Sequence, residues 1–314
     1  MDLTVVTVSY NTRALLAQCL ESVLDGLERS GLAGEVWVVD NHSADGSAEM
    51  VRTRFARTAV HLVAHDQNVG FAAGNNLALR SMNWNQGTTP RYVLFLNPDT
   101  RVVGDALGTL VRFLDAIPTA GAAGARLLND DGSFQHSAFA FPGLSQVFLD
   151  FFPLHHRLLD SRLNGRYPRR WYARGEPFAV DHPLGAALMV RAATLTEAGS
   201  FDGQYFMYCE EIDLCRRIRA AGWGVYCVPQ AEIVHLVGQS TQQFRDQMFV
   251  ALWRSRFLMF ERFESQTFCQ AARFLVRFGL WAESIRSRAA HRRGEIDARE
   301  LERRLGAYRE VAAL

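Results

Sequence analysis

The first hundred residues alternate between strand-like and helix-like segments, and this alternation constrains the fold more than any other feature. Apolar strand-like runs lie at Leu3 to Ser9, Glu35 to Asp40, 60–64 and 92–96. Between them, apolar residues recur at helical spacing, beginning after Asn11 or Thr12 as a helix cap. A βαβαβαβ series of this kind predicts a parallel, doubly wound sheet with right-handed crossovers.

Polar clusters follow all four predicted strands. They are Ser9-Tyr10-Asn11, Asp40-Asn41, Asp66 to Gly70 and Asn97-Pro98-Asp99. Ligands of doubly wound sheets bind beyond the carboxyl ends of the strands, near the point where the strand order reverses. The four clusters therefore predict one binding site on one rim of the sheet.

The turn Asn97-Pro98-Asp99 ends an apolar run abruptly. Pro98 has no amide donor and fixes its own φ, so it ends strand pairing and turns the chain. Asp99 could then hold a hard divalent cation that bridges to phosphate oxygens, although an Asp after a strand is often only a turn former. His235 ends another apolar run and could complement Asp99 as a metal ligand, the alternative being a structural histidine.

Other residues of the predicted rim suit a nucleotide. Asp40 could accept hydrogen bonds from a base or ribose, or it could simply cap its own turn. A helix start, where backbone and amide groups could approach a polar ligand, is marked by Asn68, Gly70, Phe71, Gly74, Asn75 and Asn76. The sequence has neither GxGxxG nor GxxxxGK[ST], which removes the main support for dinucleotide-binding and P-loop classes.

A second acidic cluster, Glu210, Glu211 and Asp213, lies at the predicted start of a helix. Crowded carboxylates raise one another's pKa, which suits a group that accepts a proton near neutral pH. Glu211 is the better candidate for a general base. Asp213 could instead pair with Arg217 one turn along the helix, and all three carboxylates could simply complement the helix dipole.

The chain changes character twice after the fourth strand. Residues 139–177 are aromatic, basic and weakly periodic, which predicts a functional loop or lid. Residues 241–314 have 14 arginines and 9 acidic residues, a net charge of +5, against −4 for 1–240. We expect a catalytic domain at 1–240, with a nucleotide-binding half to about 100 and an acceptor half at 101–240. The basic extension is either a packed helical appendage or an amphipathic surface that also contacts an anionic membrane.

The overall composition limits the class of protein. With 48% hydrophobic residues and a net charge of +1, the chain fits an ordinary globular protein and does not favour nucleic acid as a partner. Its five cysteines lack CxxC spacing and are expected to be buried thiols of a reducing compartment. No basic signal region and no apolar run of about 18 residues is present. We expect a cytoplasmic protein, with peripheral contact at the inner face of the plasma membrane as a further expectation.

The order of these segments resembles the inverting family 2 glycosyltransferases of GT-A fold, and in particular the rhamnosyltransferase-like group. The segments are TVVTVSYNTRALLAQCLESV, VWVVDNHSADGS, NVGFAAGNNLAL, YVLFLNPDT, PLGAALMVRAATLTEAGSFDGQYFMYCEEIDLCRRIRAAGW and IVHLVGQST. The resemblance covers about residues 3–241. It implies an α/β fold with a doubly wound mixed sheet, followed by a C-terminal helical extension.

The resemblance also implies roles for individual residues. Asp99 matches the metal-binding carboxylate of the family's DxD element, Asn97 replaces its first acid, and His235 matches a metal-contacting histidine. Glu210 and Glu211 match the acidic pair whose second member is the general base. Gly185, Ala186 and Asp213 fall near the acceptor. The positions that match nucleotide-sugar contacts are Ser9, Tyr10, Asn11, Asp40, Asn68, Gly70, Asn75, Asn97 and Asp99.

The implied activity is a Mg²⁺- or Mn²⁺-dependent inverting transfer of a hexosyl unit, with rhamnose from dTDP-rhamnose as the preferred donor. The acceptor would be a hydroxyl of a glycan or lipid-linked glycan in cell wall or other cell-surface polysaccharide assembly. Two alternatives remain: a non-catalytic nucleotide-sugar-binding scaffold of the same fold, and a nucleotidyltransferase. The intact acidic pair argues against the first, and SYNTRALLAQ, which is no glycine-rich basic phosphate loop, argues against the second.

Overall fold

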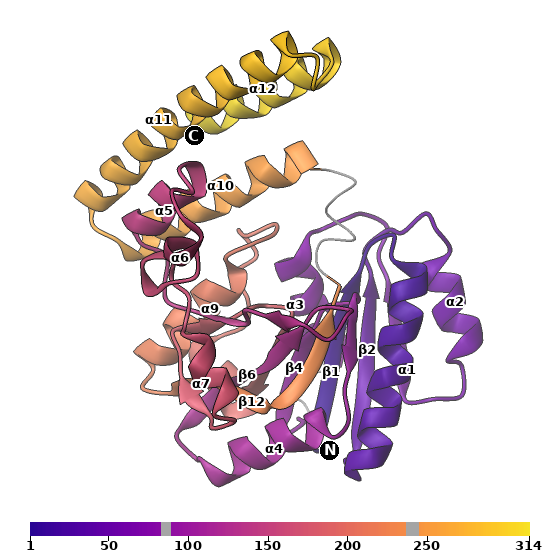
Figure 1. Cartoon of the computed structure of the whole chain (residues 1–314). Helices are drawn as coiled ribbons and strands as arrows, with labels where there is room; N and C mark the ends of the chain where they lie inside the picture. Colours follow the sequence, from indigo (N-terminus) through magenta and orange to yellow (C-terminus); the bar gives the residue numbers. More distant parts are fainter. Residues whose placement is uncertain (83–88, 237–244) are drawn as a thin grey trace. The chain divides into compact units, whose positions relative to one another are not determined.

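The computed structural model describes residues 1–82, 89–236 and 245–314 (Figure 1). The chain forms two compact units, each built from segments distant in sequence. The first unit comprises Met1–Phe139, Arg169–Phe206 and Glu210–Ser240. The second comprises Ala140–Pro168, Met207–Cys209 and Thr241–Leu314. All residues named above as candidates for the site belong to the first unit.

A mixed sheet forms the centre of the first unit, with strand order β3-β2-β1-β4-β11-β6-β12-β5. Strand β1 runs parallel to β2 and β4, whereas β11 runs antiparallel to β4 and β6. The ten strands are β1 (Leu3–Ser9), β2 (Gly34–Asp40), β3 (Val60–Ala64), β4 (Tyr92–Leu96), β5 (Thr100–Val102), β6 (Ala120–Leu128), β7 (Phe134–Gln135), β9 (Phe178–Ala179), β11 (Ala187–Arg191) and β12 (Gly224–His235). A separate two-stranded sheet pairs β8 (Ala138–Phe139) with β10 (His182–Pro183). The expected doubly wound mixed sheet is confirmed.

Helices cover both faces of this sheet, so β1 is buried along its whole length. Leu3 and Val5 join a core with apolar residues of α1 and α4, whereas Val8 faces α3, where a Cβ at Gly74 would lie 2.9 Å from the Val8 side chain. Each fully buried Val or Leu stabilises the fold by about 1.5–3 kcal/mol. The helices are α1 (Arg13–Ser30), α2 (Ser47–Arg54), α3 (Phe71–Ser81), α4 (Ala106–Ala116), α7 (Arg169–Ala173), α8 (Ala192–Ala198) and α9 (Glu210–Ala220).

Two segments differ from the sequence-based expectation. The sequence pattern of WGVYCVP and AEIVHLVG predicts two strand-like pieces, but the chain from 224 to 235 is the single strand β12, whose pairing with β6 shifts register between Val228 and Glu232. Pro229 lies in that interval and has no amide hydrogen to donate to a neighbouring strand. Because the pairing is interrupted there, the strand continues past the proline. The segment 139–177, expected to be irregular, contains α5 (Leu144–Phe151), α6 (His156–Leu159), the 3₁₀ helix η1 (Arg162–Asn164) and α7.

The second unit is helical. Besides α5, α6 and η1 it contains α10 (Arg245–Phe263), α11 (Gln266–Arg292) and α12 (Ala298–Ala313). Ser265 and Asp297 cap the starts of α11 and α12 by accepting from backbone amides. Phe151 stacks on Trp253 with ring centroids 5.2 Å apart. In the described part of the chain, no helix is long and apolar enough to cross a membrane. All five cysteines lie in the described part of the chain and are buried thiols, as expected.

Candidate active site

Two adjacent carboxylates occupy the first turn of α9. Glu210 and Glu211 are only 5% and 8% exposed. Burial raises the pKa of Glu211 to about 7, while backbone hydrogen bonds, including one from Gly185, act in the opposite direction. Burial, and then the charge of Glu211, raise the pKa of Glu210 well above its ordinary value. Glu211 can therefore exist in both protonation states near neutral pH, as a general base requires.

The structure brings Glu211 close to the segment before β11. A Cβ at Gly185 would lie 3.4 Å from both Cβ and Cγ of Glu211. The next residue, Ala186, accepts a hydrogen bond from the amide of Asn97 at 2.9 Å. Gly185 therefore brings its backbone close to the Glu211 side chain without a side chain of its own between them. The hydrogen bond between Ala186 and Asn97 connects this segment to the turn that ends β4.

Asp99 and His235 face each other at the edge of the sheet. The Oδ1 atom of Asp99 lies 3.6 Å from Nε2 of His235, and both residues are buried. Antiparallel pairing of β5 with β12 sets Thr100 opposite His235, and the Leu236 amide donates to the Asp99 carbonyl at 2.9 Å. Two segments more than a hundred residues apart in sequence thus hold the two side chains together.

The chemistry of this pair suits a divalent cation. Nδ1 of His235 lies 2.8 Å from Oε1 of Gln135, an oxygen that can only accept, so Nδ1 carries the proton and Nε2 presents a lone pair. Burial lowers the pKa of His235, which favours the neutral imidazole that metals bind, although the Asp99 charge opposes this. No cluster of three or more His, Cys, Asp or Glu is present among the described residues. Further ligands would be oxygens of the nucleotide and water, as is usual for Mg²⁺.

Two polar atoms on the rim have no partner among the described residues. Asp40, at the end of β2, accepts from the Ser43 amide through Oδ2 at 3.0 Å, but its buried Oδ1 is unsatisfied. Asn75, in the second turn of α3, donates to the Phe71 carbonyl, and its buried Oδ1 is likewise unsatisfied. Buried acceptors normally find a donor, so these two oxygens are the atoms of the rim best suited to a ligand's N–H or O–H groups.

Other predicted contacts are engaged within the rim itself. Ser9 is fully buried, with Oγ 2.9 Å from the Thr12 hydroxyl. The side chain of Asn11 accepts from the Ala44 amide at 2.8 Å. The Oδ1 of Asn68 accepts from the Asn41 side chain and from the Gly70 amide. These side chains shape the loops after β1, β2 and β3, and half-buried Tyr10 and Asn97 lie in the loops after β1 and β4.

Gly70 and Asn76 join the start of α3 to the loop before α9. Gly70 has φ +84°, and a Cβ there would lie 2.2 Å from the Phe206 carbonyl oxygen, which accepts from the Phe71 amide. The side chain of Asn76 donates to the Phe201 carbonyl at 2.7 Å and accepts from its amide at 3.1 Å. The sequence pattern placed Asn76 near a polar ligand, whereas in the structure its side chain holds the Phe201 backbone. Nothing in the sequence marks Phe206 as a positioning residue.

Asp213 has a partner within the chain. Its side chain is fully buried, and Oδ2 accepts from Nε of Arg217 at 2.7 Å. Arg217 also donates to the carbonyls of Ala198, Gly199 and Ser200. The pair anticipated from the sequence therefore exists and orders the turn after α8. Direct contact of Asp213 with an acceptor stays a prediction.

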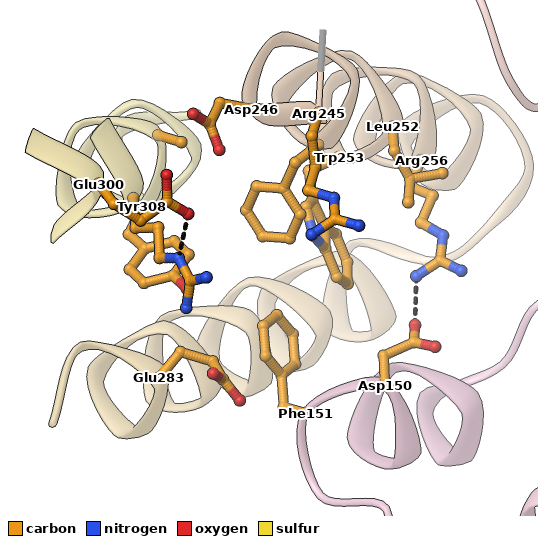
Figure 2. A pocket seen from close by; sticks show the side chains of 13 residues that line it. Asp150, Phe151, Arg245, Asp246, Leu252, Trp253, Arg256, Glu283, Glu300 and Tyr308 are labelled. Carbon is orange, nitrogen blue, oxygen red and sulfur yellow. Dashed lines mark hydrogen bonds and ion pairs between the residues drawn. The ribbon is translucent and has the colours of Figure 1, made fainter. Parts of the chain in front are cut away.

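A cavity of about 430 Å³ lies within the second unit, away from these residues in the chain (Figure 2). Its wall carries the arginines 245, 256 and 304 and four acidic residues, Asp150, Asp246, Glu283 and Glu300. Arg256 pairs with Asp150 and Arg304 with Glu300. The wall therefore has no excess positive charge that would select an anion.

Comparison with known proteins identifies the family of the chain. The model of the family described as Glycosyl transferase family 2 matches residues 4–185, more than half of the chain. The chain belongs to glycosyltransferase family 2. This glycosyltransferase is 29% identical over 249 residues to the N-acetylglucosaminyl-diphospho-decaprenol L-rhamnosyltransferase of Mycobacterium tuberculosis, covering 76% of this chain and 77% of that protein. It is 28% identical over 183 residues to rhamnosyltransferase WbbL of Escherichia coli, covering 57% and 66%.

Solved structures support the fold of this glycosyltransferase. The mannosyltransferase PcManGT from Pyrobaculum calidifontis, in complex with GDP-Man and Mn²⁺, aligns with a TM-score of 0.57 at 20% identity and covers 99% of this chain and 85% of its own. This likeness confirms the GT-A fold, which the family resemblance implied.

Proposed function

We propose that this family 2 glycosyltransferase moves rhamnose from dTDP-rhamnose to a hydroxyl of a lipid-linked glycan, with inversion at the anomeric carbon. The observation that carries the proposal is the position of Glu211, a buried carboxylate with a pKa of about 7 that lies against the backbone of Gly185. The names of the relatives support rhamnose as the sugar. The name of the mycobacterial relative supports an acceptor built on N-acetylglucosaminyl-diphospho-decaprenol or a similar lipid-linked sugar in cell-surface polysaccharide assembly.

In this proposal Glu211 removes the proton from the acceptor hydroxyl. The oxygen then attacks the anomeric carbon from the face opposite the nucleotide, so one bond forms as the bond to the diphosphate breaks. Because Glu211 is buried, water does not stabilise its carboxylate, and taking up the proton relieves an unfavourable buried charge. Glu210 beside it would favour its neutral form, because burial and the charge of an ionised Glu211 both raise its pKa.

On the donor side, Oδ1 of Asp40 and Oδ1 of Asn75 would accept from the base or ribose and so fix the orientation of the nucleotide. Asp99 and His235 would hold Mg²⁺ or Mn²⁺. Such a cation would supply positive charge that stabilises the nucleoside diphosphate as it leaves. The segment from Asn97 to Asp99 would set the reacting sugar toward Gly185 and Ala186, since the Asn97 amide is bonded to the Ala186 carbonyl.

Calorimetric titration with dTDP, UDP and GDP, each with and without Mg²⁺ or Mn²⁺, tests the donor side. We expect metal-dependent binding of dTDP in preference to the other two. A transfer assay with dTDP-rhamnose and a lipid-linked N-acetylglucosamine acceptor then tests the reaction, with Glu211→Gln as the inactive control. Nucleotide binding without release of nucleoside diphosphate would favour a scaffold, and release of pyrophosphate would favour a nucleotidyltransferase. Near-normal transfer by a well-folded Glu211→Gln protein would disprove the role given to this residue.

A further inference from the structure

Helix α11 of the second unit carries large apolar side chains on its exposed face. Phe274, Phe278, Trp281 and Ile285 are 70%, 45%, 60% and 46% exposed. Their spacing of four, three and four residues places them in one stripe along the helix. We name these four residues the α11 stripe. Contiguous exposed apolar surface on a folded protein marks an interaction site more often than a chance exposure.

The opposite face of α11 carries most of the packing of the helix within its own unit. The buried residues of the helix are mostly small: Cys269, Ala272, Val276, Gly279, Leu280 and Ser287. At Gly279 an added Cβ would lie 2.2 Å from the Phe151 ring, so α5 approaches the helix axis closely. The buried face of the helix therefore packs mostly by small side chains, while Phe274 and Trp281 point outward and Phe278, although 45% exposed, also contacts the Phe152 ring with centroids 5.5 Å apart. This reverses the usual arrangement of a surface helix, in which the apolar face points to the core.

The charge around the stripe is positive. Within α11 there are five arginines and one acidic residue, Glu283, which pairs with Arg286. Arg277 and Arg288 are exposed and lie three or four residues from members of the stripe, and the exposed Arg292 lies seven residues after Ile285, on the same side of the helix. Arg277 donates through Nε to the Ala312 carbonyl at 3.2 Å. No acidic residue of α11 lies on that side. Aromatic side chains flanked by arginine are the combination that binds the boundary between lipid headgroups and acyl chains.

We propose that the α11 stripe docks on an anionic lipid surface, with the four apolar side chains at the headgroup boundary and Arg277, Arg288 and Arg292 on lipid phosphates. A second copy of the chain fits this face less well. A twofold interface would set the same arginines of both copies near one another with no acid of α11 between them. An anionic surface neutralises them instead, at about 1 kcal/mol per arginine. This inference stands independently of the sugar and acceptor proposed above.

Co-sedimentation of the full chain with vesicles tests the proposal. We expect binding to vesicles of phosphatidylglycerol and phosphatidylcholine, weaker binding to phosphatidylcholine alone, and loss of the difference at about 0.5 M salt, where the Debye length is only a few ångströms. Arg277→Ala with Arg288→Ala should weaken partition about 30-fold, from about fivefold per arginine. Phe274→Ser with Trp281→Ser should also release the protein. Circular dichroism melting should show both double variants folded, because all four side chains are exposed.

Matched controls lie in the first unit. Val103 and Ile117 are exposed apolar residues, 39% and 36% accessible, and Arg57 is an exposed arginine. Val103→Ser, Ile117→Ser and Arg57→Ala should bind vesicles like the unaltered protein. Quenching by bromolipids gives a measurement that needs no disruptive change: tryptophan fluorescence should be quenched in the unaltered chain and much less in Trp281→Phe. Equal partition of the stripe variants and the unaltered protein would overturn the proposal. So would a dimer in solution that becomes monomeric on Phe274→Ser with Trp281→Ser while vesicle binding is unchanged.

Discussion

The carboxylate of Asp99 lies 3.6 Å from Nε2 of His235, and both side chains are almost fully buried. Gln135 accepts from the other ring nitrogen, Nδ1, so the lone pair is on Nε2, the nitrogen near the carboxylate. Two groups that both accept cannot hydrogen-bond to each other while the imidazole is neutral in this tautomer. Without a ligand, the close approach of two electron-rich groups raises the free energy of the folded protein. A cation bound by the Asp99 carboxylate and Nε2 of His235 would offset this repulsion.

Binding of the nucleotide should depend on this pair. Asp99→Asn should abolish the gain in nucleotide affinity that Mg²⁺ or Mn²⁺ provides. Gln135→Ala, which leaves both proposed ligands in place but frees the ring, should weaken the metal effect by about 10- to 100-fold. Asp130→Asn is the matched control, because Asp130 is an exposed carboxylate paired with Arg101. Calorimetry with and without metal measures all three. An unchanged metal dependence in Asp99→Asn would rule out this site.

Catalytic rate should follow the ionisation of Glu211. Since the active form is the carboxylate, kcat/KM should rise with pH and level off above the pKa of about 7. Glu211→Gln should lower kcat by about 10²- to 10⁴-fold and remove this rising limb. Initial rates of nucleoside diphosphate release across pH measure both effects. If the residual activity of Glu211→Gln still rose with pH around the same midpoint, the ionisation that controls the rate would belong to another group.

The same pKa makes a prediction about stability. The ordinary pKa of Glu211 is 4.5 and its folded value is about 7, so the folded chain binds this proton more tightly than the unfolded chain. The free energy of unfolding should therefore fall as pH rises through this interval, by on the order of 3 kcal/mol from this group. Glu211→Gln should be more stable than the unaltered protein at about pH 8 but not at about pH 4, as measured by urea unfolding. A constant difference between the two proteins across pH would contradict this.

Much of the fold followed from local pattern, because strands such as β1 and β4 are buried throughout and mostly apolar, and polar turns mark their ends. The start of α9 and the Asp213–Arg217 pair were also predictable, since both depend on residues within one helical turn. The contacts that join distant loops could not be predicted from the sequence. The Asn76 side chain bonds a backbone 125 residues away, and Phe206 meets Gly70 through its carbonyl, a group that every residue has. Composition and periodicity contain no signal for such contacts. The helices within 140–164 were missed because they are short and weakly periodic.

Breaking the pair formed by Asp213 and Arg217 should be costly. Asp213→Ala leaves Arg217, which is 19% exposed, without its carboxylate and loosens the turn at 198–200, so the loss should be about 3–5 kcal/mol. Arg309→Ala removes a pair whose two side chains are about 70% exposed and should cost less than about 1 kcal/mol. Urea unfolding compares the two. If Asp213→Ala instead kept its stability and raised only the KM for the acceptor, direct acceptor contact would be the better account.

Gly70 should tolerate no side chain. Its φ of +84° disfavours any L residue, and a Cβ would lie 2.2 Å from the Phe206 carbonyl oxygen, a backbone atom that cannot rotate away. Gly132 separates the two effects, because it has φ +77° with nothing within 4 Å of its Cβ position. Gly132→Ala should cost only about 1–2 kcal/mol, the usual penalty for the left-handed region. Gly70→Ala should cost more, and by moving Phe206 it should displace the loop that leads to Glu210, lowering kcat even where the protein remains folded. Equal destabilisation of the two variants, with kcat unchanged in Gly70→Ala, would show that this close approach does not position the base.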